Sequence, residues 1–350
     1  TRSLPRWADI GLLPLINLCI ALFVSGLVIA AIGEDPFHAI EVMIQGAFFY
    51  DGSVGYTLYY ATNFVFTGLA VSVAFHAMLF NIGGEGQAYI GGLGAGLVCL
   101  ALDPFLPGLI VVPLAIVFAA LFGAGWAFVP AYLQAYRGSH VVITTIMFNF
   151  IAAGLMVSLL NGPLIKPGQS AATTRAFAES AHVPAVHEVL AMLGVETARS
   201  PLNLSIVLAA FACIFVWLLI WRTRFGYALR TLGHSPQAAS YAGIRIPRVI
   251  IIAMAISGAL AGLMAVNEIL GAQHRLILNF TAGFGFTGIA VSLMGRNHPF
   301  GIVLASLLFG ALYQGGAELD FEFSTITREM ILLIQGCLLY TSDAADDCEG

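Results

Sequence analysis

Charged side chains are scarce in this sequence. Lys and Arg together number 14 and Asp and Glu 19 in 350 residues, or 9 % of the chain, against about 25 % in an ordinary soluble protein. Apolar residues make up 59 %, and the mean hydropathy is +0.91. The composition therefore excludes a soluble enzyme, a nucleic-acid-binding protein and a disordered chain, and it indicates a protein whose main solvent is lipid.

Lysine occurs once, as Lys166, and Ile165 precedes it. The phosphate-binding loop of an ATPase needs Gly-Lys followed by Ser or Thr, so this chain carries no such loop. HExxH, a GxSxG elbow and a pair of membrane-embedded aspartates are missing as well. We therefore predict no catalytic residue, metal site or cofactor, and we expect any ATP hydrolysis to occur on a separate subunit.

Cysteine is also rare, and its spacing fits neither a metal site nor a disulfide framework. The first four cysteines lie in apolar runs and are expected to be small buried hydrophobes: Cys19, Cys99, Cys213 and Cys337, with Cys348 as the fifth. No small-residue cleavage site follows the first apolar run, so a cleavable signal is not expected.

Long runs without charge are abundant, and a membrane-spanning helix needs about 20 apolar residues. Ten candidate runs cover 11–33, 52–84, 86–102, 104–136, 138–165, 201–221, 249–267, 276–295, 297–317 and 330–342. The eighth is interrupted by Gly283, Gly285 and Gly288. We predict an all-α polytopic membrane protein with about ten transmembrane helices, some broken by glycine, in a single domain over 1–340.

The distribution of Lys and Arg predicts a cytoplasmic N-terminus, because short cytoplasmic loops are rich in these residues. With ten spans, nine basic residues fall inside and five outside. The inside set is Arg2, Arg6, Arg137, Arg222, Arg224, Arg230, Arg245, Arg248 and Arg296, and the outside set is Lys166, Arg175, Arg199, Arg275 and Arg328. The outer loop spans 161–200 and the largest inner loop spans 222–248.

The inner loop has a helical pattern of Ala and Leu from about Tyr227 to Leu232. A Ser-Pro turn follows at Ser235, a second helical turn is predicted through 238–241, and Gly243 is expected to end it. A short amphipathic helix of this kind lies on the membrane surface or docks on a soluble partner, and the residues alone leave both open.

Polar residues interrupt two of the most apolar stretches. Asn81, Glu85 and Gln87 lie among glycines in FNIGGEGQ, which predicts either a broken helix lining a cavity or a polar hairpin on the inner face. Thr145 and Asn149 in GSHVVITTIMFN contact a solute or form interhelical hydrogen bonds. We predict that these five residues line or border a translocation path for a neutral, hydroxylated solute.

Other glycine patterns, and the pair Asn267 and Glu268, have a structural interpretation beside the functional one. The GxGxxG pattern at 283–288 lacks a preceding strand, so a helix break or close packing is favoured over nucleotide binding. The pairs Gly92–Gly96 and Gly258–Gly262 are typical of helix-packing faces. Asn267 and Glu268 end the seventh span, either as a functional site or at the outer membrane interface.

Three stretches together resemble the inner-membrane permease subunits of ABC importers of the ribose and branched-chain amino acid type. They are FNIGGEGQAYIGG, RGSHVVITTIMFN and GYALRTLGHSPQAASYAGIRIPR, the last followed by an apolar span with SGALAGL. The similarity covers about 36–335. The GSHxVITTIM stretch and the GEGQ form are most similar to the simple-sugar and nucleoside branch.

This resemblance implies a bacterial inner-membrane permease that moves a nucleoside or simple sugar inward. Its partners would be ATP-binding cassette subunits, a second permease, related or identical, and an extracytoplasmic solute-binding protein, with the lipid bilayer around it and no nucleic acid. The 226–244 segment would couple to the ATPase, through Gly226, Ala228, Leu229, Arg230, Gly233, Ala238, Ala239, Gly243 and Ile244.

Two alternatives and one departure remain. A secondary transporter or channel for a small polar solute would need buried carboxylates on its path, for which Glu85 and Glu268 are the candidates. A structural membrane scaffold would not need the glycine breaks. The last residues, CLLYTSDAADDCEG at 337–350, place four acids directly after an apolar run, and we expect this tail to be non-native.

Overall fold

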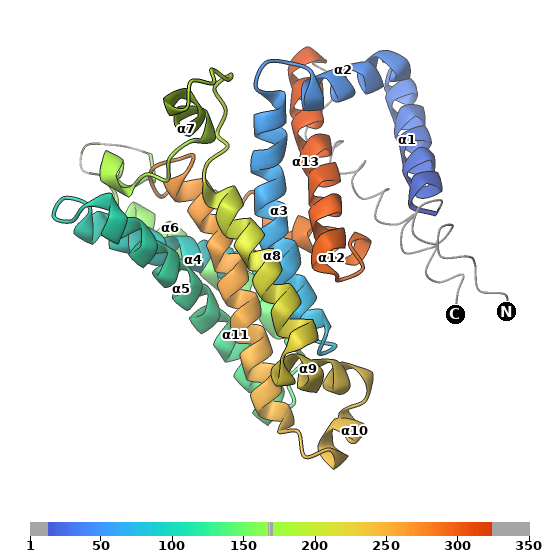
Figure 1. Ribbon diagram of the computed structural model, residues 1–350, viewed down its shortest axis with the longest axis vertical. Coiled ribbons are helices and arrows are strands. Elements are labelled where there is room, and N and C mark those ends of the chain that lie inside the picture. The colour runs from blue at the N-terminus through green and yellow to red at the C-terminus, as the bar shows by residue number, and fades with distance from the viewer. Residues whose placement is uncertain (1–12, 167, 169–170, 324–350) are drawn as a thin grey trace. The chain divides into compact units, whose positions relative to one another are not determined.

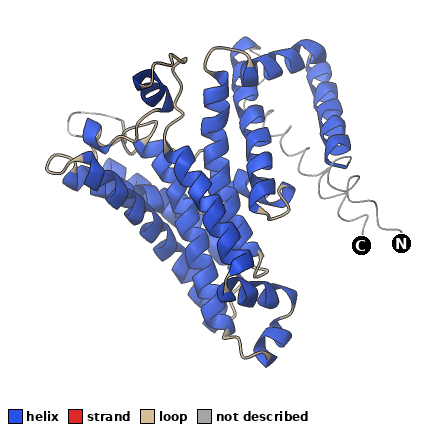
Figure 2. Cartoon of the chain, in the orientation of Figure 1, coloured by secondary structure: helices blue, strands red, loops and turns tan. Residues whose placement is uncertain are grey.

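The computed structural model describes residues 13–166, 168 and 171–323, and this part of the chain is helical with connecting loops (Figure 2). No strand occurs among these residues, only two isolated bridges. The fold is therefore all-α, as predicted. The described chain divides into two compact units, one from residues 13–60 with 307–323 and the other from the described part of 61–306.

The helices follow the predicted apolar runs closely (Figure 1). A helix occupies each of the first nine runs, and the tenth, 330–342, lies outside the described residues. The helices are α1 (Leu13–Ile32), α2 (Pro36–Phe48), α3 (Ser53–Phe75), α4 (Gly84–Leu102), α5 (Gly108–Arg137), α6 (Val141–Asn161), α7 (Val186–Met192), α8 (Ser205–Arg222), α9 (Arg224–His234), α10 (Pro236–Tyr241), α11 (Ile246–Ala265), α12 (Phe284–Met294) and α13 (Pro299–Glu322), with short turns η2 (Glu179–Ala181) and η3 (Val266–Leu270).

Six of the described helices are long and apolar enough to cross a membrane: α3, α5, α6, α8, α11 with η3, and α13. In an apolar stretch of 18 residues within each helix, 83 % of the α3 residues are buried, whereas the share is 22–28 % in α5, α6 and α8. The exposed faces of these three helices are apolar, with Phe128, Phe150 and Phe211 at the surface. The chain is therefore a multi-pass membrane protein in which most of α3 is buried, whereas α5, α6 and α8 expose apolar faces.

The first unit is held by close contacts between α2 and the later part of α13. A Cβ atom at Gly46 would meet the side chain of Glu318, and one at Gly315 would meet the backbone of Met43. The Thr57 hydroxyl donates to the carbonyl of Ala47 at 2.8 Å. Small residues thus let these backbones approach closely, as is usual where lipid supplies no hydrophobic driving force.

In the second unit α4, α5 and α11 pack through glycine. A Cβ at Gly258 would meet the carbonyl of Gly123, and one at Gly262 would meet that of Ala119. The prediction that Gly258–Gly262 forms a helix-packing face is confirmed. For Gly92–Gly96 the partner differs from the prediction, because Phe280 and Leu276, from the non-helical segment before α12, occupy the space beside them.

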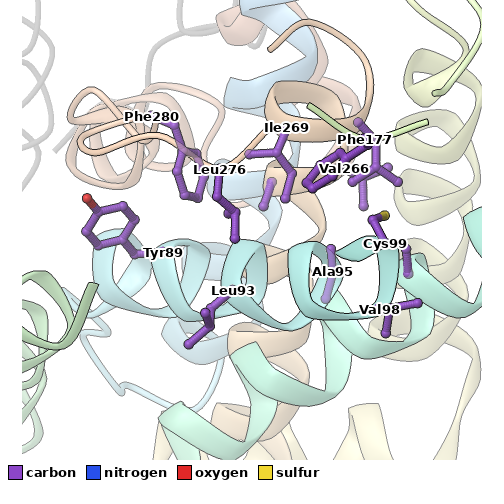
Figure 3. Close-up of a cluster of buried hydrophobic side chains, with 14 of the residues drawn as sticks. Tyr89, Leu93, Ala95, Val98, Cys99, Phe177, Val266, Ile269, Leu276 and Phe280 are labelled. Atoms are coloured by element: carbon purple, nitrogen blue, oxygen red, sulfur yellow. The ribbon is translucent and has the colours of Figure 1, made fainter. Parts of the chain in front are cut away.

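A cluster of buried hydrophobic side chains surrounds α4 (Figure 3). Phe280 lies over Tyr89 with ring centroids 5.2 Å apart, and Leu276 lies above the glycine-rich face of α4. Val266, Ile269 and Phe177 complete the same cluster. The interrupted eighth span, 276–295, is thus part of the core. Its first part, 276–283, is irregular chain packed on α4, and its second part is the short helix α12.

The predicted outer and inner loops lie at opposite ends of α8, whose first residue follows one and whose last residue precedes the other (Figure 1). The middle of the 161–200 segment is held by an ion pair and by hydrogen bonds. Arg175 forms a bidentate ion pair with Asp103, at 2.5 and 2.9 Å, and the backbone N–H of Ala178 donates to the same carboxylate. Val183 N–H donates to the carbonyl of Leu270.

Candidate functional site

The predicted inner segment forms a helix–turn–helix, α9 and α10, at one end of α8 and α11 (Figure 1). Thr223 caps α9 by accepting from Gly226 N–H at 3.0 Å, and Ser235 caps α10 by accepting from Ala238 N–H at 3.2 Å. Pro236 is the first residue of α10, and Gly243 follows it with φ +74°. The predicted helix, Ser-Pro turn and terminating glycine are all present.

The side chains predicted for coupling divide into two groups. Gly226, Leu229 and Ala239 are buried, and a Cβ at Gly233 would meet the carbonyl of His76. These residues therefore have packing roles within the chain. Ala228, Arg230 and Ile244 are half-buried, while Ala238 and Gly243 are exposed.

The outward surface of α10 includes a residue that the pattern analysis missed. Tyr241 is 94 % exposed at the end of α10, and Tyr227 on α9 is 61 % exposed. Large amphipathic side chains at an exposed tip are typical anchors of protein interfaces. The sequence signal was present, since Tyr241 directly follows the small residues that predicted a close fit.

The five residues predicted for the translocation path lie together around the bend between α3 and α4. Asn81 donates to Gln87 at 2.9 Å and to the Ser257 hydroxyl at 2.8 Å. Asn149 accepts from Gly86 N–H and donates to the carbonyl of Ile82, both at 2.9 Å. Buried polar side chains thus satisfy the backbone of this non-helical segment, as they must inside a membrane.

Thr145 is fully buried on the same face of α6 as Asn149, and its hydroxyl donates to the carbonyl of Val141 at 2.8 Å. This hydrogen bond lies within α6 and not between helices. Asn81 and Gln87 are each 1 % exposed, and Glu85 is half-buried. The structure brings the five residues together around this segment. Among the five, Asn81 and Gln87 bond each other, and Glu85 is the most accessible member.

Glu85 explains the GxGxxG pattern. Its carboxylate accepts from Gly283 N–H at 2.9 Å and from Gly285 N–H at 2.8 Å, at the N-terminus of α12. Gly283 has φ +83°, and a Cβ at Gly285 would meet the backbone of Glu85. The glycines therefore form an anion-binding helix N-terminus, as in phosphate loops, but the anion is a carboxylate of the same chain.

A second buried network, at the far end of α11, was only partly anticipated. Asn63 on α3 donates to Glu268 at 2.6 Å and accepts from Asn267 at 2.7 Å. Asn267 in turn accepts from Asn203 at 2.9 Å and from the Ser205 hydroxyl at 2.6 Å. Glu268 is 4 % exposed. Both interpretations for Asn267 and Glu268, a functional site and a position at the outer membrane interface, stay predictions, and the structure adds that both side chains are buried.

Asn267 and Glu268, the two members of this network at the end of α11, lie in η3, which is a single π-helical turn. A π-turn inside an apolar helix is rare and is frequent at functional sites. Asn63 carried no local signal, because its partner Glu268 is 205 positions away in the sequence. The network joins α3, α8 and η3 through hydrogen bonds.

The chemistry of both clusters is that of neutral hydrogen bonding with carboxylates held by internal donors. Within the part of the chain that the structure describes, no three His, Cys, Asp or Glu side chains are grouped as a metal site would require. The two cysteines described, Cys99 and Cys213, are unbonded to each other, and Cys99 is buried in the core around α4.

Comparison with known proteins extends the argument to the whole chain. The family model described as "Branched-chain amino acid transport system / permease component" matches residues 53–342. The guanosine ABC transporter permease protein NupP of Bacillus subtilis is 33 % identical over 95 % of this chain and 93 % of its own length.

Two further relatives are similar over nearly the same extent. The nucleoside ABC transporter permease protein NupB of Lactococcus lactis subsp. cremoris is 32 % identical over 94 % of this chain and 89 % of its own. The glucose ABC transporter permease protein TsgB13 of Haloferax volcanii is 29 % identical over 97 % of this chain and 88 % of its own.

Proposed function

The chain belongs to the family of permease components of branched-chain amino acid transport systems, and from this premise we propose that it is the transmembrane permease subunit of an ATP-driven importer that moves a nucleoside or simple sugar inward. The observation that carries the proposal is the similarity to nucleoside and glucose permeases over almost the full length of both chains. The chain itself is not the catalyst, and ATP is hydrolysed on a separate subunit.

The proposed coupling element is α9 with α10. Both helices lie at one end of α8 and α11, and their outward residues include Ala238 and Tyr241. The segment 222–248 contains five arginines and no acidic residue. A soluble partner therefore has an accessible, positively charged surface to bind, which favours docking on an ATP-binding subunit over rest on the membrane alone.

The same positive charge supports the proposed orientation in the bacterial inner membrane. Arg137 ends α5, Arg248 lies in the first turn of α11, and Arg296 lies in the turn between α12 and α13, all at the end of the second unit that carries α9. By the positive-inside rule this end is cytoplasmic, and with ten spans the N-terminus is cytoplasmic as well. The 161–200 segment then faces an extracytoplasmic solute-binding protein.

The proposed translocation path runs beside the cluster of Asn81, Glu85, Gln87, Thr145 and Asn149. The support is their grouping at a break between two helices, where glycines leave little side-chain bulk. Because most of these side chains are already hydrogen-bonded, they border the path and give a neutral solute weak contacts at the accessible edge. Weak contacts suit transport, since a tightly held solute would not leave.

Reconstitution into proteoliposomes tests the function. The chain is purified with its ATP-binding subunit, second permease and solute-binding protein, and uptake of labelled guanosine and glucose is followed with and without ATP. We expect ATP-dependent uptake of one solute and none when the ATP-binding subunit is omitted. Equal uptake without that subunit would contradict the proposal and indicate a secondary transporter or channel.

The proposed pairing is tested in the same system. Two ATP-binding subunits present two docking surfaces, and this chain has one α9–α10 segment, so two permease chains are needed. Mass photometry of the active complex is expected to give two permeases per transporter. Full uptake by a complex containing a single copy and no second permease would refute the pairing, while an active homodimer would refute only a distinct partner.

A further inference from the structure

A cavity of about 340 Å³ lies beside α9, at the same end of the second unit as the proposed coupling segment. Three separate stretches of chain line it: the turn after α3, the later half of α9 and the turn before α13. Its polar lining consists of His76, Arg230, His234, Arg296 and Asn297. The volume falls at the lower end of the range for small-ligand sites.

Among the described residues that line the cavity there is no Asp or Glu. The sequences that contribute to the cavity or flank it, 72–80, 222–248 and 289–300, contain no Asp or Glu. Burial is the largest cause of the lowered pKa of His76. The hydrogen bond to the backbone of Ser72 raises the pKa by less than burial lowers it, and the positive charges of Arg230 and His298 lower it further. Two arginines and two histidines from three separate stretches of chain are therefore gathered around this cavity.

The walls are fixed by the fold. The Ser72 hydroxyl donates to the carbonyl of Asn297 at 2.7 Å, and the Ser292 hydroxyl donates to the Asn297 side chain at 2.8 Å. A Cβ at Gly233 would meet the carbonyl of His76, so α9 lies directly against the turn after α3. These contacts hold the two turns in place whether or not a ligand is present.

Both turns adopt unusual backbone conformations. Met78, Arg296 and Asn297 have φ of 54°, 50° and 54°, although none of them is glycine. Such left-handed residues cost energy and persist where the surrounding structure requires them. Arg296 lies in the turn between α12 and α13, where it is exposed and lines the cavity.

We propose that this cavity binds a phosphate group, held by Arg230 and Arg296 with His76 and His234 as further donors. Arginine binds phosphate through paired N–H groups, and two arginines on different elements can engage one phosphate from two sides. The phosphate belongs to a membrane lipid headgroup or to a soluble phosphate compound. Exposed Met78 at the rim adds an apolar surface beside the cations.

The experiment measures binding by the purified full chain. Inorganic phosphate is titrated calorimetrically in detergent, and phosphatidylglycerol retention is measured by native mass spectrometry from nanodiscs that contain it in a neutral lipid background. The test variant is R230Q/R296Q. The control is R245Q/R248Q, which removes the same charge from the same end of the unit but outside the cavity.

We expect R230Q/R296Q to weaken binding about tenfold or more, because two charge-assisted contacts are lost, and R245Q/R248Q to change it less than threefold. Binding of phosphatidylglycerol alone identifies a lipid site, and binding of inorganic phosphate alone identifies a soluble ligand. Equal weakening by both double variants would overturn the proposal, since it would indicate a diffuse potential. No binding of either probe by the wild type would overturn it too.

A second measurement needs no variant. The imidazole of His76 is titrated by NMR in the wild-type protein, with and without the probe that binds. A phosphate beside His76 favours its protonated form, so we expect its pKa to rise on binding. An unchanged His76 titration at saturating probe would place the phosphate elsewhere and refute the site.

Discussion

Glu85 is the residue on which two separate parts of the sequence meet. It lies in the first turn of α4, and its carboxylate accepts hydrogen bonds from the N–H groups of Gly283 and Gly285 at the start of α12. A charged acceptor at a helix N-terminus is stabilised by the helix dipole, and the dipole is stabilised in return. The residue thus fixes the position of α12, which by its length of 11 residues cannot span a membrane alone.

Replacing Glu85 by Gln keeps the shape of the side chain and removes its charge. We expect E85Q to lower the free energy of unfolding by about 2 kcal/mol, since charge-assisted hydrogen bonds contribute more than neutral ones. Denaturant unfolding in mild detergent measures it. The control is E196Q, at an exposed position of the 161–200 segment, which should change stability by less than about 0.5 kcal/mol. Equal stability of both variants would argue against the cap.

His274 predicts how stability depends on pH. Its ring stacks on that of His182 with centroids 3.7 Å apart, and its pKa is lowered from 6.5, first by burial and then by the positive charge of His182. Between 6.5 and that lower value the unfolded chain binds more protons than the folded chain. Stability therefore falls as pH drops through 6.5 and levels off below the folded pKa.

H274Q removes this contribution, so the loss of stability between pH 7 and pH 5 should be smaller than in the wild type. Thermal unfolding at several pH values checks it. H38Q, at an exposed histidine of α2, is the matched control and should keep the wild-type dependence. His76 acts in the same direction, so some dependence should remain in H274Q. A wild-type profile in H274Q would contradict the prediction.

At the scale of elements, α5 and α11 are joined by backbone contact. Gly123, Gly258 and Gly262 leave no room for a side chain between the two helices. Gly125, two positions along α5, has open space where its Cβ would lie. Packing against α11 thus requires the glycine at 123 and does not require the one at 125.

These two positions make a matched test. We expect G123A to destabilise the protein by about 2 kcal/mol, because a methyl group there displaces a packed backbone. G125A should be neutral or stabilising by up to about 1 kcal/mol through higher helix propensity. The midpoint of thermal unfolding and the yield of monodisperse protein measure both. Equal effects at the two positions would show that close packing does not set the requirement.

The elements themselves could be predicted from sequence, whereas their partners could not. Apolar runs gave the helices, and Ser235, Pro236 and Gly243 gave the bounds of α10, because caps and turns are local chemistry. The contact between Asn63 and Glu268 joins positions 205 apart, and nothing near either residue indicates the other. Likewise Gly92 and Gly96 indicated close packing but not that Phe280 and Leu276 would supply it.

Burial was the other property that the sequence left undetermined. Ala239 was predicted to face a partner, but it is fully buried, so a bulky residue there would disturb α10 itself. Small residues are equally suited to packing within a chain and between chains. For this reason the surface that tests the coupling role is the exposed one, which includes Tyr241.

At the scale of the whole molecule, Tyr241 offers a test of the proposed coupling to an ATPase. Its side chain is 94 % exposed, so Y241A should leave stability unchanged within about 0.5 kcal/mol. If Tyr241 anchors the partner, we expect ATP-driven uptake to fall at least about tenfold, as for loss of an interface anchor worth more than 1.4 kcal/mol. Uptake in proteoliposomes and co-purification of the ATP-binding subunit measure it.

Y136A is the control, because Tyr136 is 60 % exposed near the end of α5, outside α9 and α10. It should retain uptake close to the wild type. Normal uptake by Y241A, with the ATP-binding subunit still attached, would remove Tyr241 from the interface. A loss of uptake in both variants would indicate a general effect of surface tyrosines at this end.

The glycine-packed pair of α5 and α11 has a mechanical consequence. Two helices in close backbone contact stiffen each other, so the pair resists bending. α11 has 20 residues, about 30 Å of helix, with α10 before its first turn and the Asn63–Glu268 network after its last. We therefore expect a displacement of α10 to be passed along α11 to that network, whose residues Asn267 and Glu268 lie in the π-turn that follows the helix.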